Sequence, residues 1–155
     1  MTDLVVGLGN RWRGDDAAGL AVAERLAGRL PGVTVRACER PPPDLFAWWE
    51  PTSRVVLVDA AAPAGAPGAV HRFDAVAAPL PCEVLRVSTH GGGVAEAVEL
   101  ARALGGLPRE LVVFALEGAS FEHGAPLSAP ARRAVDEVVE ALLRELGGSP
   151  CTRPG

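Results

Sequence analysis

Two carboxylates and one imidazole lie near the carboxyl ends of three predicted strands. Asp15 and Asp16 follow the first strand and lie at the start of a helix, so either could supply the first carboxylate. Asp59 ends a strand over residues 54–59, and His90 follows a strand over residues 84–88. In parallel sheets, ligands bind beyond the carboxyl ends of the strands. Because two carboxylates and an imidazole can hold one metal ion and leave coordination positions open, the sequence predicts a mononuclear metal site.

Each of these residues also has a simpler interpretation. Asp15 and Asp16 could only complement the dipole of the helix that they begin. Asp59 could form a turn after its strand, and His90 could cap the next helix or remain in solvent. The placement of all three at one edge of the sheet favours a shared site over three unrelated structural roles.

The glycines after the first strand do not form a nucleotide-binding motif. A dinucleotide fingerprint needs a third glycine for close helix packing, and that position is Trp12. Glu39, at the end of the second strand, lies farther along the chain than the roughly 20 residues of that fingerprint. A phosphate-binding loop needs a lysine, and the chain has none. A nucleotide-binding module would rest on Gly7 and Gly9 alone, so no nucleotide cofactor is predicted.

The hydrophobic pattern predicts strands that alternate with helices. Short apolar runs bounded by glycine or proline predict buried strands, and apolar residues spaced three and four apart predict amphipathic helices. The predicted strands cover residues 4–7, 33–38, 54–59, 69–73, 84–88 and 111–116. The predicted helices cover residues 15–30, 44–49 and 94–104, and a final helix capped by Ser128 reaches Leu146. This alternation indicates a three-layer α/β fold with a mainly parallel sheet, in which the strand over 69–73 is antiparallel.

Length and composition predict one globular domain. The chain has 155 residues, of which 48% are apolar and 22% charged, a balance that allows one hydrophobic core. We expect the domain to cover residues 1–146 and a flexible tail to cover residues 147–155. The net charge of −4 argues against a nucleic-acid partner. No apolar run is long enough for a membrane span, and the absence of a basic leader favours the cytoplasm.

The order of short motifs along the chain resembles that of one protein family. Residues 7–19 read G-L-G-N-R-W-R-G-D-D-A-A-G and resemble the opening motif of the hydrogenase maturation proteases. V-D-A at residues 58–60 resembles the end of the family's third strand, and S-T-H at residues 88–90 resembles its S-x-H segment. L-E-G at residues 116–118 and L-S at residues 127–128 resemble its closing strand and the start of its last helix.

The resemblance covers residues 4–146 and implies both a fold and an activity. Members of this family remove a short C-terminal extension from the large-subunit precursor of nickel–iron hydrogenase after nickel insertion, and so activate the hydrogenase. The resemblance implies an aspartic-type endopeptidase with a three-layer α/β/α fold and a twisted, mainly parallel sheet of about five to six strands. It implies that Asp16, Asp59 and His90 are the catalytic, metal-contacting residues. The metal is the nickel that the precursor carries, and zinc or cadmium can take its place.

One segment departs from the family pattern. The family usually carries a Gly-Thr loop after its second strand, and residues 39–43 here read E-R-P-P-P. This departure favours an alternative function, that of a non-catalytic paralogue that binds a partner subunit without cutting it, whereas the intact triad opposes it. The nearby aromatic residues Phe46, Trp48 and Trp49 belong either to the core or to a protein-docking surface.

Overall fold

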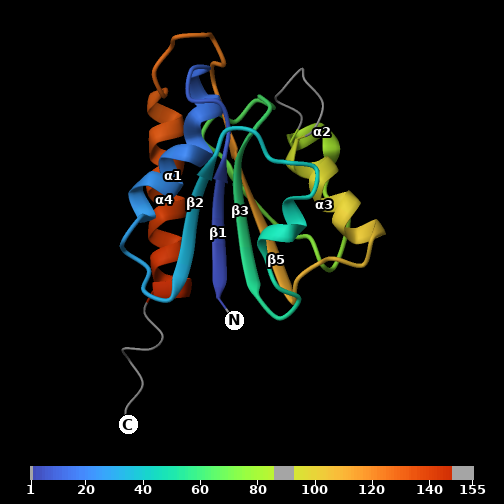
Figure 1. Ribbon diagram of the computed structural model, residues 1–155. Coiled ribbons are helices and arrows are strands. Elements are labelled where there is room, and N and C mark those ends of the chain that lie inside the picture. Colours follow the sequence, from blue (N-terminus) through green and yellow to red (C-terminus); the bar gives the residue numbers. More distant parts are fainter. Residues whose placement is uncertain (1, 86–92, 148–155) are drawn as a thin grey trace.

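The computed structural model describes residues 2–85 and 93–147 of the chain (Figure 1). The strands are β1 (Asp3–Leu8), β2 (Val33–Cys38), β3 (Arg54–Ala61), β4 (Val70–Asp74) and β5 (Glu110–Glu117). The helical segments are η1 (Gly14–Ala17), α1 (Ala18–Leu26), η2 (Leu45–Trp48), α2 (Cys82–Leu85), α3 (Val94–Ala103), α4 (Ala129–Leu142) and η3 (Leu143–Gly147). None of the described helices is long and apolar enough to cross a membrane. The predicted tail falls almost entirely on residues 148–155, which lie outside the described residues.

The five strands form one mainly parallel sheet between two layers of helices. The strand order is β2-β1-β3-β5-β4, and only β4 runs antiparallel, against β5. In Figure 1, α1 and α4 cover one face of the sheet, and η2, α2 and α3 cover the other. This arrangement confirms the predicted three-layer fold, including the antiparallel strand. The carboxyl ends of β1, β3 and β5 therefore meet at one edge of the sheet.

Each face of the sheet contributes to its own hydrophobic cluster. On the side of α1 and α4, the fully buried residues include Val5, Val22, Leu26, Val58 and Leu142. On the opposite side they include Val6, Leu45, Leu57, Val98 and Leu111. Strand β3 supplies both clusters, which explains its continuous run of apolar residues.

The aromatic residues after β2 belong mainly to the second of these clusters. Trp49 is buried there, and its indole N–H donates to the carbonyl oxygen of Gly106 at 2.9 Å. Phe46 and Trp48 are partly buried and pack against the same cluster. The guanidinium carbon of Arg36 lies over the Trp48 ring, 4.0 Å from the ring centroid. The structure therefore supports the core interpretation of these aromatics, because the indole of Trp49 is not free to meet a partner.

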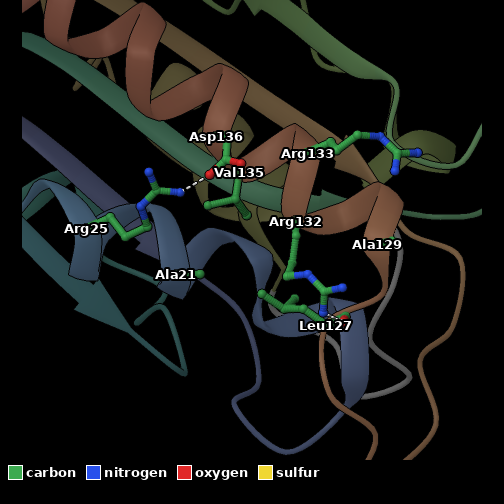
Figure 2. A pocket seen from close by; sticks show the side chains of 8 residues that line it. All are labelled: Ala21, Arg25, Leu127, Ala129, Arg132, Arg133, Val135 and Asp136. Atoms are coloured by element: carbon green, nitrogen blue, oxygen red, sulfur yellow. Dashed lines mark hydrogen bonds and ion pairs between the residues drawn. The ribbon is translucent and has the colours of Figure 1, made fainter.

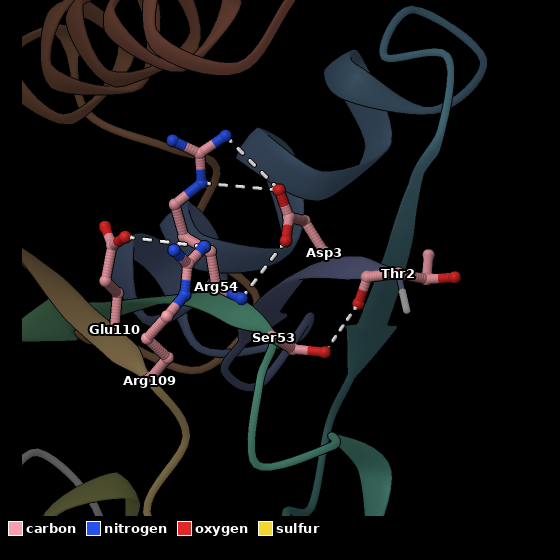
Figure 3. A network of polar contacts seen from close by, with 6 residues as sticks. All are labelled: Thr2, Asp3, Ser53, Arg54, Arg109 and Glu110. Carbon is pink, nitrogen blue, oxygen red and sulfur yellow. Dashed lines mark hydrogen bonds and ion pairs between the residues drawn. The ribbon is translucent and has the colours of Figure 1, made fainter.

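Polar contacts at the amino edge of the sheet fix the start of β1 against the start of β3 (Figure 3). The Asp3 carboxylate accepts hydrogen bonds from the backbone N–H and from the guanidinium of Arg54, at 3.1 to 3.3 Å. The Ser53 hydroxyl donates to the carbonyl oxygen of Thr2 at 3.0 Å. These contacts lie at the edge opposite the predicted site, and they set the register that carries Asp59 to the other edge.

Two predicted elements differ most from those of the structure. The helix predicted over residues 15–30 begins as the 3-10 turn η1 and ends at Leu26. Ala27 leaves the helical path with a ψ of 126°, and Gly28 follows with a φ of 77°. The strand predicted over residues 84–88 is wrong in its described part, where α2 includes Val84 and Leu85. Proline is tolerated in a first helical turn, and the carbonyl oxygen of Pro81 accepts the N–H of Val84 at 3.1 Å. The rest of that predicted strand lies outside the described residues.

Candidate active site

Asp16 is placed by the close approach of η1 to the end of β1. Gly9 has a positive φ of 151°, and a Cβ atom at this position would collide with the carbonyl oxygen of Asp16. The N–H of Asn10 donates to the same carbonyl oxygen at 3.1 Å. Gly9 therefore permits a contact that no other residue type would allow, and this contact holds Asp16 at the carboxyl edge of the sheet.

A second glycine brings α1 directly onto the sheet. A Cβ atom at Gly19 would collide with the carbonyl oxygens of Leu8 in β1 and Val58 in β3. The glycines of the opening motif are thus explained by helix–strand packing. This packing places the residues before α1 beside the carboxyl half of β3.

Asp59 lies within β3, which is two residues longer than predicted. It is opposite Ala115 of β5 in the register of the sheet, and the strand continues to Ala61. Its Oδ1 atom accepts the N–H of the next residue, Ala60, at 2.8 Å. Asp59 is therefore a residue of the central strand, near the carboxyl end of β3, and not a turn former.

Asp16 and Asp59 form a pair of buried carboxylates. Their exposed fractions are 6% and 8%. Burial raises the pKa of Asp59 well above its usual range, and the negative charge of Asp16 raises it further, against a smaller effect of the Ala60 N–H. Burial also raises the pKa of Asp16, which the charge of Arg13 lowers only in part. Both carboxylates would thus be stabilised by a cation that bound between them.

The structure brings together two of the three predicted site residues. The third, His90, lies outside the described residues, and its position relative to the pair remains a prediction. Among residues 2–85 and 93–147, no group of three His, Cys, Asp or Glu side chains is arranged to hold a metal ion. The described part of a metal site is therefore the Asp16–Asp59 pair.

Asp15, the neighbour of Asp16, has a different environment. Its carboxylate accepts the N–H and the hydroxyl of Ser128, both at 2.7 Å, and the N–H groups of Ala119 and Ser120 at 2.7 and 3.2 Å. Burial opposes ionisation of Asp15, but these hydrogen bonds outweigh it and lower the pKa of the carboxyl. Neither η1 nor α1 has a side-chain cap, so Asp15 and Asp16 do not cap the helix that follows them. Asp15 instead holds the segment between β5 and α4.

Glu117, the last residue of β5, is a second carboxylate with a structural role. Its Oε2 atom accepts the N–H groups of Ala64 and Ala66 at 2.9 and 2.6 Å, and its Oε1 atom lies 3.8 Å from Nε2 of His71. The hydrogen bond from Ala64 is the main cause of the lowered pKa of Glu117, aided by Ala66 and His71 against the effect of burial. In the sequence, Glu117 is recognisable only as part of the L-E-G motif that resembles the family's closing strand. Its role carries no local signal, because its donors come from a loop with no recognisable spacing.

A separate hollow lies between α1 and α4 (Figure 2). It has a volume of about 440 Å³, and its lining includes Arg25, Arg132, Arg133 and Asp136. The single carboxylate of this lining, that of Asp136, is paired with the guanidinium of Arg25. This hollow therefore lacks the carboxylate pair that a metal or hydrolytic site would use, and the candidate active site remains at the edge of the sheet.

Both the sequence and the fold of the chain are similar to those of known proteins. The family model of the hydrogenase maturation proteases, HycI, matches residues 41–145. The NiFe hydrogenase maturation protease HycI from Thermococcus kodakarensis KOD1 is 26% identical, with 94% of this chain and 92% of that chain covered and a TM-score of 0.70. The endopeptidase HycI from Escherichia coli is 24% identical, with coverage of 96% and 94% and a TM-score of 0.72. The hydrogenase maturating endopeptidase HybD from E. coli is 23% identical, with coverage of 95% and 94% and a TM-score of 0.72. No curated protein sequence matches the chain.

Proposed function

Since this chain belongs to the hydrogenase maturation protease family, we propose that it is an endopeptidase acting on a hydrogenase large-subunit precursor. It removes the C-terminal extension of that precursor once nickel has been inserted. The reaction is hydrolysis of one peptide bond, and the product is the mature large subunit. The proposed place of action is the cytoplasm, where the precursor would meet the enzyme before assembly.

The observation that carries this proposal is the Asp16–Asp59 pair at the carboxyl edge of the sheet. The two side chains are buried, and their own charges oppose each other. The protein supplies few hydrogen-bond donors to them, in contrast with Asp15 beside them. Two buried carboxylates that repel each other lower the free energy of unfolding unless a bound cation or substrate compensates for them. Strongly perturbed carboxylates of this kind concentrate at functional sites.

The donor types fit the metal that the precursor carries. We assign Asp16, Asp59 and His90 as the residues that bind the precursor's nickel. Two carboxylates and an imidazole suit nickel, zinc or cadmium better than magnesium, which prefers an all-oxygen shell. Binding of the precursor through its own metal would place the scissile peptide beside the two carboxylates and exclude precursors without nickel.

The same pair supplies proton transfer for hydrolysis. A carboxyl group with a raised pKa can hold a proton near neutral pH and release it during the reaction. In our proposal, one carboxylate of the pair accepts a proton from the attacking water, and the proton then passes to the leaving amine. Asp59 is the better candidate for this role, because its burial and the neighbouring Asp16 make its ionised form the stronger base of the two.

The test is incubation of the purified protein with a nickel-loaded large-subunit precursor, followed by mass spectrometry of the precursor. We expect loss of the C-terminal peptide with the wild-type protein, and a decrease in rate of at least about a hundredfold in Asp16→Asn and Asp59→Asn. Asp136→Asn is the matched control, because Asp136 is an aspartate of the α1–α4 hollow that is paired with Arg25. It should process the precursor at the wild-type rate.

The outcomes separate the two candidate functions. Stable binding of the precursor without any cleavage would reject the endopeptidase and support the non-catalytic paralogue. Cleavage at the wild-type rate by both Asp16→Asn and Asp59→Asn would reject the carboxylate pair as the catalytic site. The E-R-P-P-P segment at residues 39–43 stands where the family has its Gly-Thr loop, so the experiment also shows whether cleavage survives this replacement.

A further inference from the structure

Among the described residues, Arg13 brings a positive charge to the carboxylate pair through its contact with Asp16. Its Nη1 atom lies 3.5 Å from Oδ2 of Asp16, and both side chains are largely shielded from solvent. On its other side, the guanidinium carbon lies 5.9 Å from the centroid of the Phe121 ring, within the range of a cation–π contact. The guanidinium is therefore held between a carboxylate of the proposed site and an aromatic ring of the loop after β5.

The surrounding backbone fixes Arg13 at this place. The N–H of Arg13 donates to the carbonyl oxygen of Asn10 at 3.3 Å, and the N–H of Asp16 donates to the carbonyl oxygen of Arg13 at 3.0 Å. Asp15, between them, is anchored by its N–H to the carbonyl oxygen of Ser120 at 2.9 Å. The base of the Arg13 side chain is thus tied to the same framework that places Asp16.

The aromatic ring is fixed as well. A Cβ atom at Gly118 would collide with the ring of Phe121 and crowd the Cβ of Asp15. The ring packs into the space that Gly118 leaves free, so its position depends on the same residues that hold the end of β5. Phe121 therefore offers the guanidinium a stable second contact that does not involve Asp16.

A metal ion beside the Asp16 carboxylate would be repelled by the guanidinium of Arg13, because like charges repel at this range. We propose that Arg13 is the resident counter-ion of the site, which keeps free metal ions out and gives way only to a metal delivered by the precursor. This inference rests on the proposed function, since it assumes that Asp16 and Asp59 bind the precursor's nickel. A precursor adds protein–protein contacts to the metal contact, and a free ion does not.

The geometry suits a contact that must be displaced in each turnover. Arg13 and Asp16 share one long contact and not the bidentate pair that arginine forms with carboxylates in permanent ion pairs. The guanidinium keeps its contact with Phe121 when it leaves Asp16, so displacement does not expose an unpartnered charge. Arg13 is accordingly a specificity-determining residue, and it takes no part in the proposed proton transfer.

The experiment is isothermal titration of the metal-free protein with Cd²⁺, and it needs no precursor. Arg13→Met keeps the length of the side chain and removes its charge, and we expect it to bind Cd²⁺ about three- to tenfold more tightly than the wild type. Arg13→Lys retains the charge and should stay within about twofold of the wild type. Arg11→Met is the matched control. It removes the same charge two positions away, where Arg11 contacts Glu24 and Glu39 and not the site.

A second readout uses the precursor. In the processing reaction, added Zn²⁺ should inhibit Arg13→Met at a lower concentration than it inhibits the wild type or Arg11→Met. Unchanged or weaker Cd²⁺ binding by Arg13→Met, or an equal gain in Arg11→Met, would overturn the role of Arg13. Asp59→Asn separates this failure from that of the proposed function. Cd²⁺ binding that survives Asp59→Asn would overturn the metal contact of the carboxylate pair itself.

Discussion

Asp15 and Asp16 are adjacent in the chain and both are buried, but their surroundings differ in the number of hydrogen-bond donors. Asp15 accepts four hydrogen bonds within 3.2 Å, whereas Asp16 has one long contact with Arg13. The same contrast separates Glu117, which accepts hydrogen bonds from two backbone N–H groups, from Asp59, which accepts one from the N–H of its own neighbour, Ala60. The pKa is lowered in the donor-rich pair and raised in the donor-poor pair.

This comparison shows that burial alone does not decide what a carboxylate does. Four buried carboxylates lie at one edge of the sheet, and the donors around them divide the four into two classes. The donor-rich pair stabilises loops in the folded protein. The donor-poor pair decreases its stability and remains available to a cation or a substrate proton. Changes at the two pairs should therefore have opposite effects on folding.

The largest effect on folding is expected from Asp15→Ala. This change leaves the N–H groups of Ala119, Ser120 and Ser128 without their acceptor, and it should lower the free energy of unfolding by about 3 kcal/mol. Because the pKa of Asp15 is lowered in the folded state, this stabilisation is complete above the ordinary aspartate pKa. It is lost as the pH falls through the lowered value.

Urea unfolding of wild type and Asp15→Ala at pH 7 and at pH 3 measures this difference. The gap between the two proteins should narrow at the lower pH. Asp16→Ala is the control, since it removes an adjacent aspartate that has one long contact. Equal destabilisation by the two changes would contradict the division into donor-rich and donor-poor carboxylates.

A smaller effect of opposite sign is expected from Asp59→Asn. Since the pKa of Asp59 is raised in the folded state, ionisation of this group is unfavourable to folding. This loss of unfolding free energy is absent below the ordinary aspartate pKa. It grows as the pH rises toward the raised pKa of the folded state, and above that pKa it is constant. Asp59→Asn removes it and should increase the free energy of unfolding by about 1 to 2 kcal/mol at pH 8.

The measurement is urea unfolding of Asp59→Asn and wild type between pH 4 and pH 8. The stability difference should increase with pH, while the processing activity of the variant is lost. An Asp59→Asn protein that is less stable than wild type throughout this range would show that Asp59 is a structural residue.

The smallest effect is expected from Glu117→Gln, and it should be local. The glutamine carbonyl oxygen can still accept from the N–H groups of Ala64 and Ala66, but it carries no full negative charge and binds them more weakly. Their amide hydrogen exchange should become faster, with little change in the global unfolding transition. Exchange at Ala119 should stay unchanged, because that N–H is held by Asp15. Unaltered exchange at both Ala64 and Ala66 would show that the carboxylate of Glu117 does not stabilise this loop.

Local pattern predicted most of the fold and part of the site. Continuous apolar runs predicted β1, β3 and β5, because burial on both faces leaves a strong signal in the sequence. It failed at α2, where apolar residues after Pro81 favoured a strand, since a four-residue helix is too short for periodicity to reveal. The strand ends predicted Asp59 and the pair Asp15 and Asp16, and the family motif selected Asp16. The structure brings Asp16 and Asp59 together.

The different roles of Asp15 and Asp16 could not be predicted from local sequence. The donors of Asp15 come from the segment before α4, and Ser128 lies 113 positions later in the chain. Spacing rules describe neighbours on one element, and they carry no information about such distant partners. Arg13 and Asp16 are only three residues apart in the sequence, a spacing that brings side chains together in a 3-10 turn. The sequence does not reveal that η1 is such a turn, so this contact was not predicted.

The position of β5 between β3 and β4 has a consequence for the synthesis of this protein on the ribosome. The chain emerges from its amino end, so β3 and β4 are complete before β5 exists, and each pairs with β5 in the finished sheet. Until residue 117 has been made, β3 has an open edge and β4 has no partner in the sheet, a state in which nascent chains are prone to aggregate. Ser128, which holds Asp15 and with it the turn that carries Asp16, is made later still. The proposed site is therefore completed only after most of the chain has left the ribosome, and a partly synthesised copy cannot bind a precursor through it.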